Sequence, residues 1–400
     1  MKKTICELFA GVGGFRLGFE RQSNDWKTTW FSQWEPGAKY QWAHQCYVSH
    51  WGDIDKNTGI DIALVDKKEI PDHNLLVGGF PCQDYSVAHS LSSSKGLEGK
   101  KGVLWWQIRD ILEEKKPPFV LLENVDRLLK SPARQRGRDF GVILSCFAQL
   151  DYSVEWRVVN AAEYGAAQRR RRIFIFAYKN DTNNGIKNSN KTADDIILHD
   201  GLFAKAFPIS SNSAIKNSEL KFKDLVMISD KYKFNFDNAG YMTKGQISTC
   251  EVKPHKENSI NLIDIIEHNV SDEFYITNNL EKWNYLKGAK KINRTSKDGH
   301  SYVFSEGAIA FPDQLNMPAR TMLTSESTLN RSTHVIQDID TNNLRLLTPV
   351  EAERIQGFED NWTNTGMPKK MRYFCMGNAL VVPMITRMAV IISHIFDEEK

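Results

Sequence analysis

Residues 7 to 20 read ELFAGVGGFRLGFE, and this stretch decides the fold class. An apolar run, TICELFA, ends in Gly11, Gly13 and Gly14, and a helix-like segment, FRLGFERQ, follows. A strand that ends in glycines and opens into a helix brings backbone close to a nucleotide-like cofactor in many α/β proteins. The dinucleotide fingerprint fits only in part, because Arg16 stands where a third glycine is expected. On the glycines alone, a tight turn without a ligand is an equal alternative.

The first 178 residues alternate between strand-like and helix-like patterns. This alternation predicts an α/β fold with a doubly wound, mostly parallel sheet that binds its ligands at the carboxyl ends of the strands. Apolar and β-branched runs predict strands at 4–10, 28–35, 74–80, 118–125, 154–161 and 172–178. Helical spacing of apolar residues predicts helices at 103–114 and 140–150.

The composition of the chain changes after Tyr178, where a polar, Asn-rich connector begins. We therefore expect a first domain over 1–179 and a second, smaller mixed domain over 180–344. Order returns at RLLTPVEAERIQGF, and the apolar run NALVVPMITRMAVIISHIF predicts a long helix. This helix is too apolar to stand alone, so residues 345–400 are expected to return to the first domain.

The composition argues against a disulfide-linked, metal-binding or membrane-spanning protein. The chain has 400 residues, 41% of them hydrophobic, and a net charge of +3. Its six cysteines are scattered, without a C-x-x-C pair or clustered histidines, which argues against disulfides and a metal site. We expect a cytoplasmic protein, since charge and glycine interrupt any leader and no run of eighteen apolar residues could span a membrane. The basic strip QRRRR at 168–172 suits phosphate groups, although charge runs are more often solvated.

Three predicted strand ends carry reactive side chains. Cys82 lies in GGFPCQDYS, Glu123 in ENV closes the strand predicted at 118–125, and QRRRR precedes the last strand. Two acids could serve a cofactor: Glu35 for ribose hydroxyls, and Asp53 in GDI, expected after a strand, for an adenine amine. The alternatives are a structural Cys82, and a Glu123 that caps a strand or pairs with an arginine.

The ordered motifs ELFAGVGGF, GGFPCQ, ENV, QRRRR, RLLTPVEAERIQGF and MGNAL resemble those of the DNA cytosine-5 methyltransferases. They span residues 7 to 384 and leave only 180–320 unmatched. The resemblance implies a Rossmann-like fold that uses S-adenosyl-L-methionine, with a target-recognition domain at 180–344. It implies that Cys82 attacks carbon 6 of a flipped cytosine, that Glu123 contacts ring nitrogen 3, and that Arg170 holds the exocyclic oxygen.

The resemblance also carries over binding residues. For the cofactor they are Phe9, Ala10, Gly11, Gly13, Gly14, Phe15, Glu35, Asp53, Ile54, Pro81, Leu104, Asn378 and Ala379. For DNA they are Gln83, Ser86, Lys101, Gln168, Arg172, Arg320, Thr321 and Arg331. Residues 84–102 would form a loop that closes over DNA, although an ordinary surface loop has the same composition. Lys101 stands where relatives often carry arginine, which keeps the charge and loses the bidentate fork. Asn378 could equally cap the start of a helix.

We therefore expect a DNA cytosine-5 methyltransferase of the bacterial restriction–modification type. It would act as a monomer on a short sequence of double-stranded DNA, without metal or membrane, and would protect host DNA from a cognate restriction endonuclease without a stable complex. The alternatives are a tRNA cytosine-5 methyltransferase and a catalytically silent DNA-binding homologue. A long, specialised recognition segment favours DNA, and the intact catalytic positions argue against the silent homologue.

Overall fold

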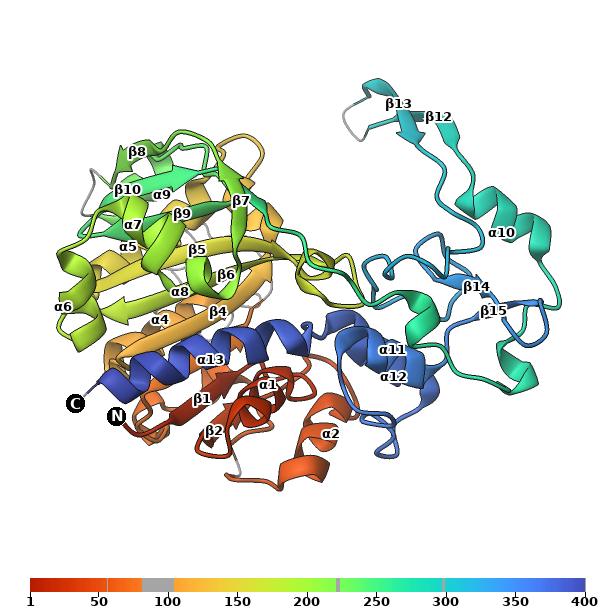
Figure 1. Cartoon of the computed structure of the whole chain (residues 1–400), viewed down its shortest axis with the longest axis horizontal. Helices are drawn as coiled ribbons and strands as arrows, with labels where there is room; N and C mark the ends of the chain where they lie inside the picture. The colour runs from red at the N-terminus through yellow and green to blue at the C-terminus, as the bar shows by residue number, and fades with distance from the viewer. Residues whose placement is uncertain (56, 81–103, 221–223, 297–298, 400) are drawn as a thin grey trace.

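The computed structural model describes residues 1–55, 57–80, 104–220, 224–296 and 299–399. Within these ranges a nine-stranded sheet forms the centre of the molecule, with helices on both faces (Figure 1). The strand order is β2-β1-β3-β4-β6-β5-β9-β10-β8. This arrangement confirms the α/β class expected from the glycine-rich entry.

The sheet is mixed, not mostly parallel as predicted. The pairs β2-β1, β1-β3 and β3-β4 are parallel, and every pair from β4 to β8 is antiparallel. The parallel strands are β1 (Thr4–Leu8), β2 (Lys27–Ser32), β3 (Leu75–Gly79) and β4 (Phe119–Val125). The others are β5 (Tyr152–Asn160), β6 (Arg171–Lys179), β8 (Lys216–Glu219), β9 (Ala239–Thr243) and β10 (Gln246–Cys250). Strand periodicity finds the strands but not their direction, because the alternation of side chains is the same either way.

Helices cover both faces of the sheet. One face packs on α4 (Leu104–Lys115), α5 (Arg138–Gln149) and α9 (Leu225–Lys231). The other packs on α1 (Gly14–Gln22), α8 (Leu202–Ala206) and α13 (Val382–Glu398). The C-terminal helix lies against the first part of the chain: α13 packs on α1 so closely that a Cβ at Gly18 would be 2.6 Å from Ile385. The amino group of Met1 donates to the carbonyl of Phe396 at 3.0 Å.

The central sheet continues beyond the boundary expected near residue 180. Strands β9, β10 and β8 extend it. The π-helix Ile196–Asp200 contacts both α8 and α7 (Ala193–Asp195), and α6 (Asn183–Ser189) contacts α13. A small second sheet pairs β7 (Ile209–Asn212) with β11 (Val252–Pro254). Strand β8 was not predicted from the sequence, because it lies at the sheet edge, is largely exposed and is polar.

Two buried charges on β5 fasten this added segment to the sheet. Glu155 accepts hydrogen bonds from the backbone N–H groups of Leu202 and Phe203 at the start of α8, and burial raises its pKa to about 7. Arg157 donates to the carbonyls of Ile197, at 2.7 Å, and Phe207, at 3.4 Å. The carboxylate of Glu155 thus accepts from backbone N–H groups at the start of α8, where a helix has free donors. The guanidinium of Arg157 donates to backbone carbonyls.

A second module follows the sheet. It contains α10 (Leu280–Lys287), β12 (Lys290–Thr295), β13 (Ser301–Glu306), β14 (Val335–Gln337) and β15 (Leu344–Leu346). Its core joins α11 (Pro349–Gln356), α12 (Lys369–Asn378), α1 and α2 (Trp42–Trp51) in one hydrophobic cluster. The expected boundary at residue 345 falls inside β15, which pairs with β14.

A buried ionic network links this module to the C-terminal segment. The guanidinium of Arg345 contacts Asp338 at 2.7 Å and Glu351 at 2.7 and 2.9 Å, and all three side chains are fully buried or nearly so. Glu351 also closes a capping box with Thr348 at the start of α11. The first arginine of the RLLTPVEAERIQGF motif, Arg345, therefore has a structural role.

Arg345→Met should lower the free energy of unfolding by about 3 to 5 kcal/mol, because two buried carboxylates lose their shared cation. Chemical denaturation measures this change. The control is Lys187→Ala, which removes an exposed partner of Glu398 and should cost less than about 1 kcal/mol. Equal losses of unfolding free energy in the two variants would contradict a stabilising role for the buried Arg345 network.

Candidate active site

The carboxyl end of β4 and the start of β6 meet because these strands run antiparallel. Glu123 pairs with Phe174 and Val125 pairs with Arg172 in the register. The Nε of Arg172 lies 2.8 Å from Oε1 of Glu123, and the two side chains are 18% and 13% exposed. A largely buried carboxylate and a largely buried guanidinium thus lie together at one edge of the sheet.

The end of β3 lies directly beside this pair. Gly79 is the register partner of Glu123, and a Cβ at Gly79 would be 3.2 Å from Oε2 of Glu123. Cys82 follows Gly79 by three positions in the sequence. Cys82, Pro81, Gln83, Ser86 and Lys101 lie outside the described residues, but the strand that leads to them ends next to Glu123.

The other five cysteines are unsuited to nucleophilic attack. All five are buried. Burial raises the pKa of Cys46 to about 12 and that of Cys146 to about 11, and it also raises the pKa of Cys6, Cys250 and Cys375. Because the thiolate is the reactive form, these residues are inert in the folded chain.

Arg170 does not lie where a substrate contact was expected. Its side chain is buried, and it donates to the carbonyls of Met322 and Gly377, each at 3.0 Å. The pKa of Arg170 is lowered to about 9, chiefly by burial and also by neighbouring Arg172, while Glu123 acts in the opposite direction. Its terminal amines therefore join two distant segments, and Arg172 takes the place beside Glu123.

Three residues predicted to contact DNA are turned inward. Gln168 is fully buried and accepts from the N–H of Met322 at 3.0 Å. Arg320 donates two hydrogen bonds, of 2.6 and 3.0 Å, to the carboxylate of Asp313. Arg331 donates to the carbonyls of Leu286, Gly288 and Gly307. Thr321 lies nearer the surface and donates to the carbonyl of Arg169 at 2.7 Å. These internal partners favour structural roles.

The glycine-rich turn leaves room above its first glycine. Phe9, Gly11 and Gly13 have positive φ angles of 54°, 58° and 89°. A Cβ at Gly11 would meet nothing within 4 Å, whereas one at Gly13 would lie 2.2 Å from Trp51. Gly14 is close to Leu380, and the side chains of Ala10 and Phe15 are buried in the core. The turn is thus open to a ligand at Gly11 and closed by packing at Gly13.

Polar groups surround this opening. Gln33 accepts from the N–H of Gly11 at 2.7 Å, and its own N–H donates to the carbonyl of Thr58. Glu35 follows β2, and partial burial raises its pKa. Asp53 accepts from the hydroxyl of Thr58 at 2.7 Å. Asp53 follows α2, not a strand as expected, and exposed Ile54 comes next.

The last predicted motif reaches the same region. Asn378 is exposed and ends α12, so the alternative in which it caps the start of a helix is wrong. Ala379 follows it, and Leu380 packs over Gly14. Leu104, at the start of α4, is partly buried against the core. Residues that follow β1, β2, α2 and α12 therefore lie near the glycine-rich turn.

The sequence interpretation missed one buried acid in the motif itself. Glu7 is fully buried, accepts from the hydroxyl of Tyr47 at 3.0 Å, and is hydrogen-bonded by the backbone N–H groups of Phe15 and Arg16. Burial raises its pKa to about 7. An acid inside an apolar strand was the available signal, since such a group needs partners. Glu7 holds the glycine turn to the start of α1.

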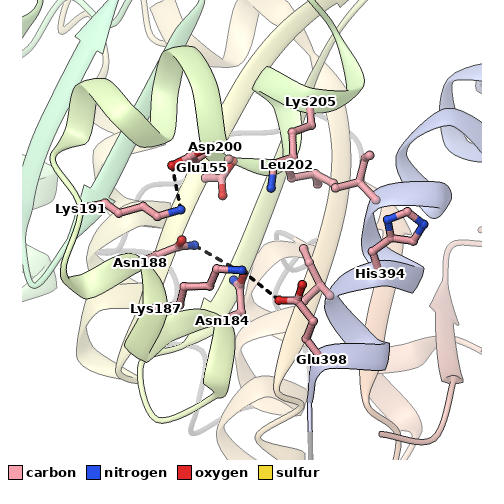
Figure 2. A pocket seen from close by; sticks show the side chains of 13 residues that line it. Glu155, Asn184, Lys187, Asn188, Lys191, Asp200, Leu202, Lys205, His394 and Glu398 are labelled. Carbon is pink, nitrogen blue, oxygen red and sulfur yellow. Dashed lines mark hydrogen bonds and ion pairs between the residues drawn. The ribbon is translucent and has the colours of Figure 1, made fainter.

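One cavity among the described residues lies away from this turn. It has a volume of about 120 Å³ and lies between α6, α8 and α13, with Glu155 at its base (Figure 2). Ion pairs of Lys187 with Glu398 and of Lys191 with Asp200 flank it. None of the predicted site residues lines it. The described residues also contain no cluster of potential metal ligands.

No single helix in the described ranges is both long and apolar enough to cross a membrane. Helices α12 and α13 meet the length and composition criteria only as a pair, with a bend of 43° between them.

Solved structures share this fold. The S. pombe Dnmt2 methyltransferase superposes with a TM-score of 0.60 at 14% identity, covering 98% of each chain. The Entamoeba histolytica methyltransferase EhMeth gives 0.59 at 16% identity, covering 100% of this chain and 99% of the other. A Rossmann-like methyltransferase fold is therefore confirmed.

Sequence comparison is more specific. The chain is 54% identical over 394 residues to the type II methyltransferase M.Sau3AI of Staphylococcus aureus, covering 97% of this chain and 94% of that protein. The family described as C-5 cytosine-specific DNA methylase matches residues 3–394. These findings support DNA cytosine-5 methylation over both the tRNA enzyme and the silent homologue. The chain belongs to the C-5 cytosine-specific DNA methylase family.

Proposed function

We propose that this enzyme modifies a cytosine flipped out of double-stranded DNA through Cys82, Glu123 and Arg172, as the methylase of a type II restriction–modification system. The observation that carries the proposal is the 2.8 Å pair of Glu123 and Arg172 beside the end of β3. The high identity to M.Sau3AI supports the type II assignment. The enzyme would act as a monomer in the cytoplasm, and a cognate endonuclease would cut the same sequence without a stable complex.

The thiolate of Cys82 would begin the reaction. Attack of Sγ on carbon 6 forms the sulfur–carbon bond and makes carbon 5 nucleophilic. A cysteine with an ordinary pKa near 8.5 is only a few per cent thiolate at neutral pH, so positive charge nearby assists it. Arg172, which lies beside the end of β4, would provide that charge. Because carbon 6 is inaccessible in a duplex, the base must leave the helix.

Glu123 and Arg172 would hold the base during this attack. The carboxyl of Glu123 can share a proton with ring nitrogen 3 as charge builds on the ring. Arg172 fixes Oε1 of that carboxyl and lies close enough to orient the base. We infer that it takes the orienting role that the motif alone assigned to Arg170. Loss of the carbon 5 proton and release of Sγ would then regenerate the enzyme.

The described residues fit S-adenosyl-L-methionine, which when bound supplies the methyl group. The open space over Gly11 and the acids Glu35 and Asp53 suit an adenosine, with Ile54 and Phe9 beside the ring. Asn378 and Ala379, at the end of α12, would reach the amino acid end. Gly13 and Gly14 would shape the turn, and Ala10, Phe15 and Leu104 would support it from the core. Pro81 would contribute from the end of β3.

We also propose revised limits for the domains. The catalytic domain would include the strands up to Pro254, because β9, β10 and β8 belong to its sheet. The recognition module would then start near Leu262, the first residue after Pro254 in the hydrophobic cluster that includes α11, α12, α1 and α2, and end with β15. DNA would lie between this module and residues 84–102, where Gln83, Ser86 and Lys101 are proposed contacts.

The activity is tested with tritiated cofactor, duplex DNA and tRNA in separate reactions, followed by bisulfite sequencing of the DNA. We expect label in DNA alone and 5-methylcytosine at one short sequence. Label confined to tRNA, or the absence of label in both, would refute the proposal.

The two arginines should have separable effects. Arg172→Ala should lower the single-turnover rate about 100- to 1000-fold, as loss of one preorganised donor does, with little change in stability. Arg170→Ala should lower the free energy of unfolding by about 1 to 3 kcal/mol, because buried carbonyls of Met322 and Gly377 lose their donor. Quenched-flow kinetics and thermal unfolding measure both. The reverse pattern would restore the substrate role to Arg170.

A further inference from the structure

The β12–β13 ribbon is an exposed surface without an assigned role. It projects beyond α10 as a separate two-stranded ribbon that stands clear of the central sheet (Figure 1). Six antiparallel register pairs, from Lys290 with Glu306 to Thr295 with Ser301, hold the two strands together. Because side chains alternate along a strand, the ribbon has two distinct faces.

One face is partly covered and internally satisfied. Ile292 and Phe304 are opposite each other and half-buried. Arg294 lies over the ring of Phe304 at 4.0 Å, and Lys290 lies over Tyr285 of α10 at 4.3 Å. This face anchors the ribbon to its own module.

The other face is fully exposed and has no internal partners. Its residues form three neighbouring pairs in the register. They are Lys291 with Ser305, Asn293 with Val303, and Thr295 with Ser301. All six are exposed, and within the described part of the chain none has a side-chain hydrogen bond or ion pair. The face combines one cation, an amide, three hydroxyls and one apolar side chain, and it carries no acid.

The base of the ribbon is held rigidly by an arginine that the sequence had assigned to DNA. Arg331 donates to Gly288, just before β12, at 3.0 Å and also to Gly307, just after β13. Its Nε lies 3.7 Å from the carboxylate of Glu306. One guanidinium therefore braces both strands where they leave the module. A reader of base edges needs such fixed placement, because its hydrogen bonds depend on geometry.

We propose that the exposed face of the β12–β13 ribbon enters the major groove of DNA and reads base edges. The inference rests on the proposed function and names the specificity element of that site. The major groove admits a two-stranded ribbon, and its bases offer partners for each side chain present. An amide suits adenine, a lysine suits guanine, hydroxyls suit either, and an apolar group suits the thymine methyl. The absence of acid on this face matches the negative charge of DNA.

The test compares wild-type enzyme with Asn293→Ala, Thr295→Ala and Ser305→Ala on a duplex library randomised around the methylated cytosine. Bisulfite sequencing reports the preference at each position. We expect each substitution to relax one or two positions, by about ten- to one-hundred-fold for Asn293→Ala, while the others stay fixed. Asn284→Ala is the matched control, since it truncates an exposed amide on α10 and should preserve the preference.

Each result decides the inference. Unchanged preferences in all three variants would overturn it, as would a loss of rate that is equal at every sequence. A change in oligomeric state by light scattering, with preference intact, would assign the face to a second copy instead and would also overturn it. The variants alter exposed side chains, and cofactor affinity by calorimetry checks their folding. If wild-type enzyme methylates no DNA, the proposed function fails; if it methylates one site and the variants keep that site, only the ribbon assignment fails.

Discussion

The antiparallel pairing of β6 with β4 determines where the proposed chemistry can take place. In a parallel neighbour the start of β6 would lie at the amino end of β4, far from Glu123. The observed pairing puts Arg172, at the beginning of β6, against the end of β4, and Gly79 of β3 lies on the other side. An acid, a cation and the strand that leads to Cys82 are thus assembled at one edge. Backbone hydrogen bonding fixes this arrangement, so it does not depend on a flexible loop.

Arg170 couples this edge to the rest of the molecule. Its two bonds reach Met322, in the recognition module, and Gly377, next to Asn378 at the proposed cofactor site. A Cβ at Gly377 would lie 2.4 Å from the backbone of Leu323, so these segments touch. A buried cation that holds two carbonyls is costly to disturb. The proposed catalytic residues, the proposed cofactor site and the proposed recognition module therefore meet at Arg170.

Much of the fold was readable from the sequence, and the reasons for the failures are specific. Apolar runs located the strands from β1 to β6, and the glycine turn and Glu123 fell at strand ends as expected. QRRRR could not show which arginine faces the acid, because side-chain direction depends on the first residue of β6. Arg320 and Arg331 looked like surface cations, since Asp313 and the carbonyls near Gly288 and Gly307 become neighbours only in the fold. The polar strands β8 and β12 lack the apolar alternation that marks a buried strand.

The central claim is that Cys82 forms a covalent bond with its target beside Glu123 and Arg172. The most direct measurement is mass spectrometry of the enzyme after incubation with cofactor and duplex DNA that carries 5-fluorocytosine, which cannot lose its carbon 5 substituent as a proton. Peptide mapping should place a stable nucleotide adduct on Cys82, and Cys82→Ser should form none. The five buried cysteines should remain unmodified. No adduct, or an adduct on any other cysteine, would contradict the account.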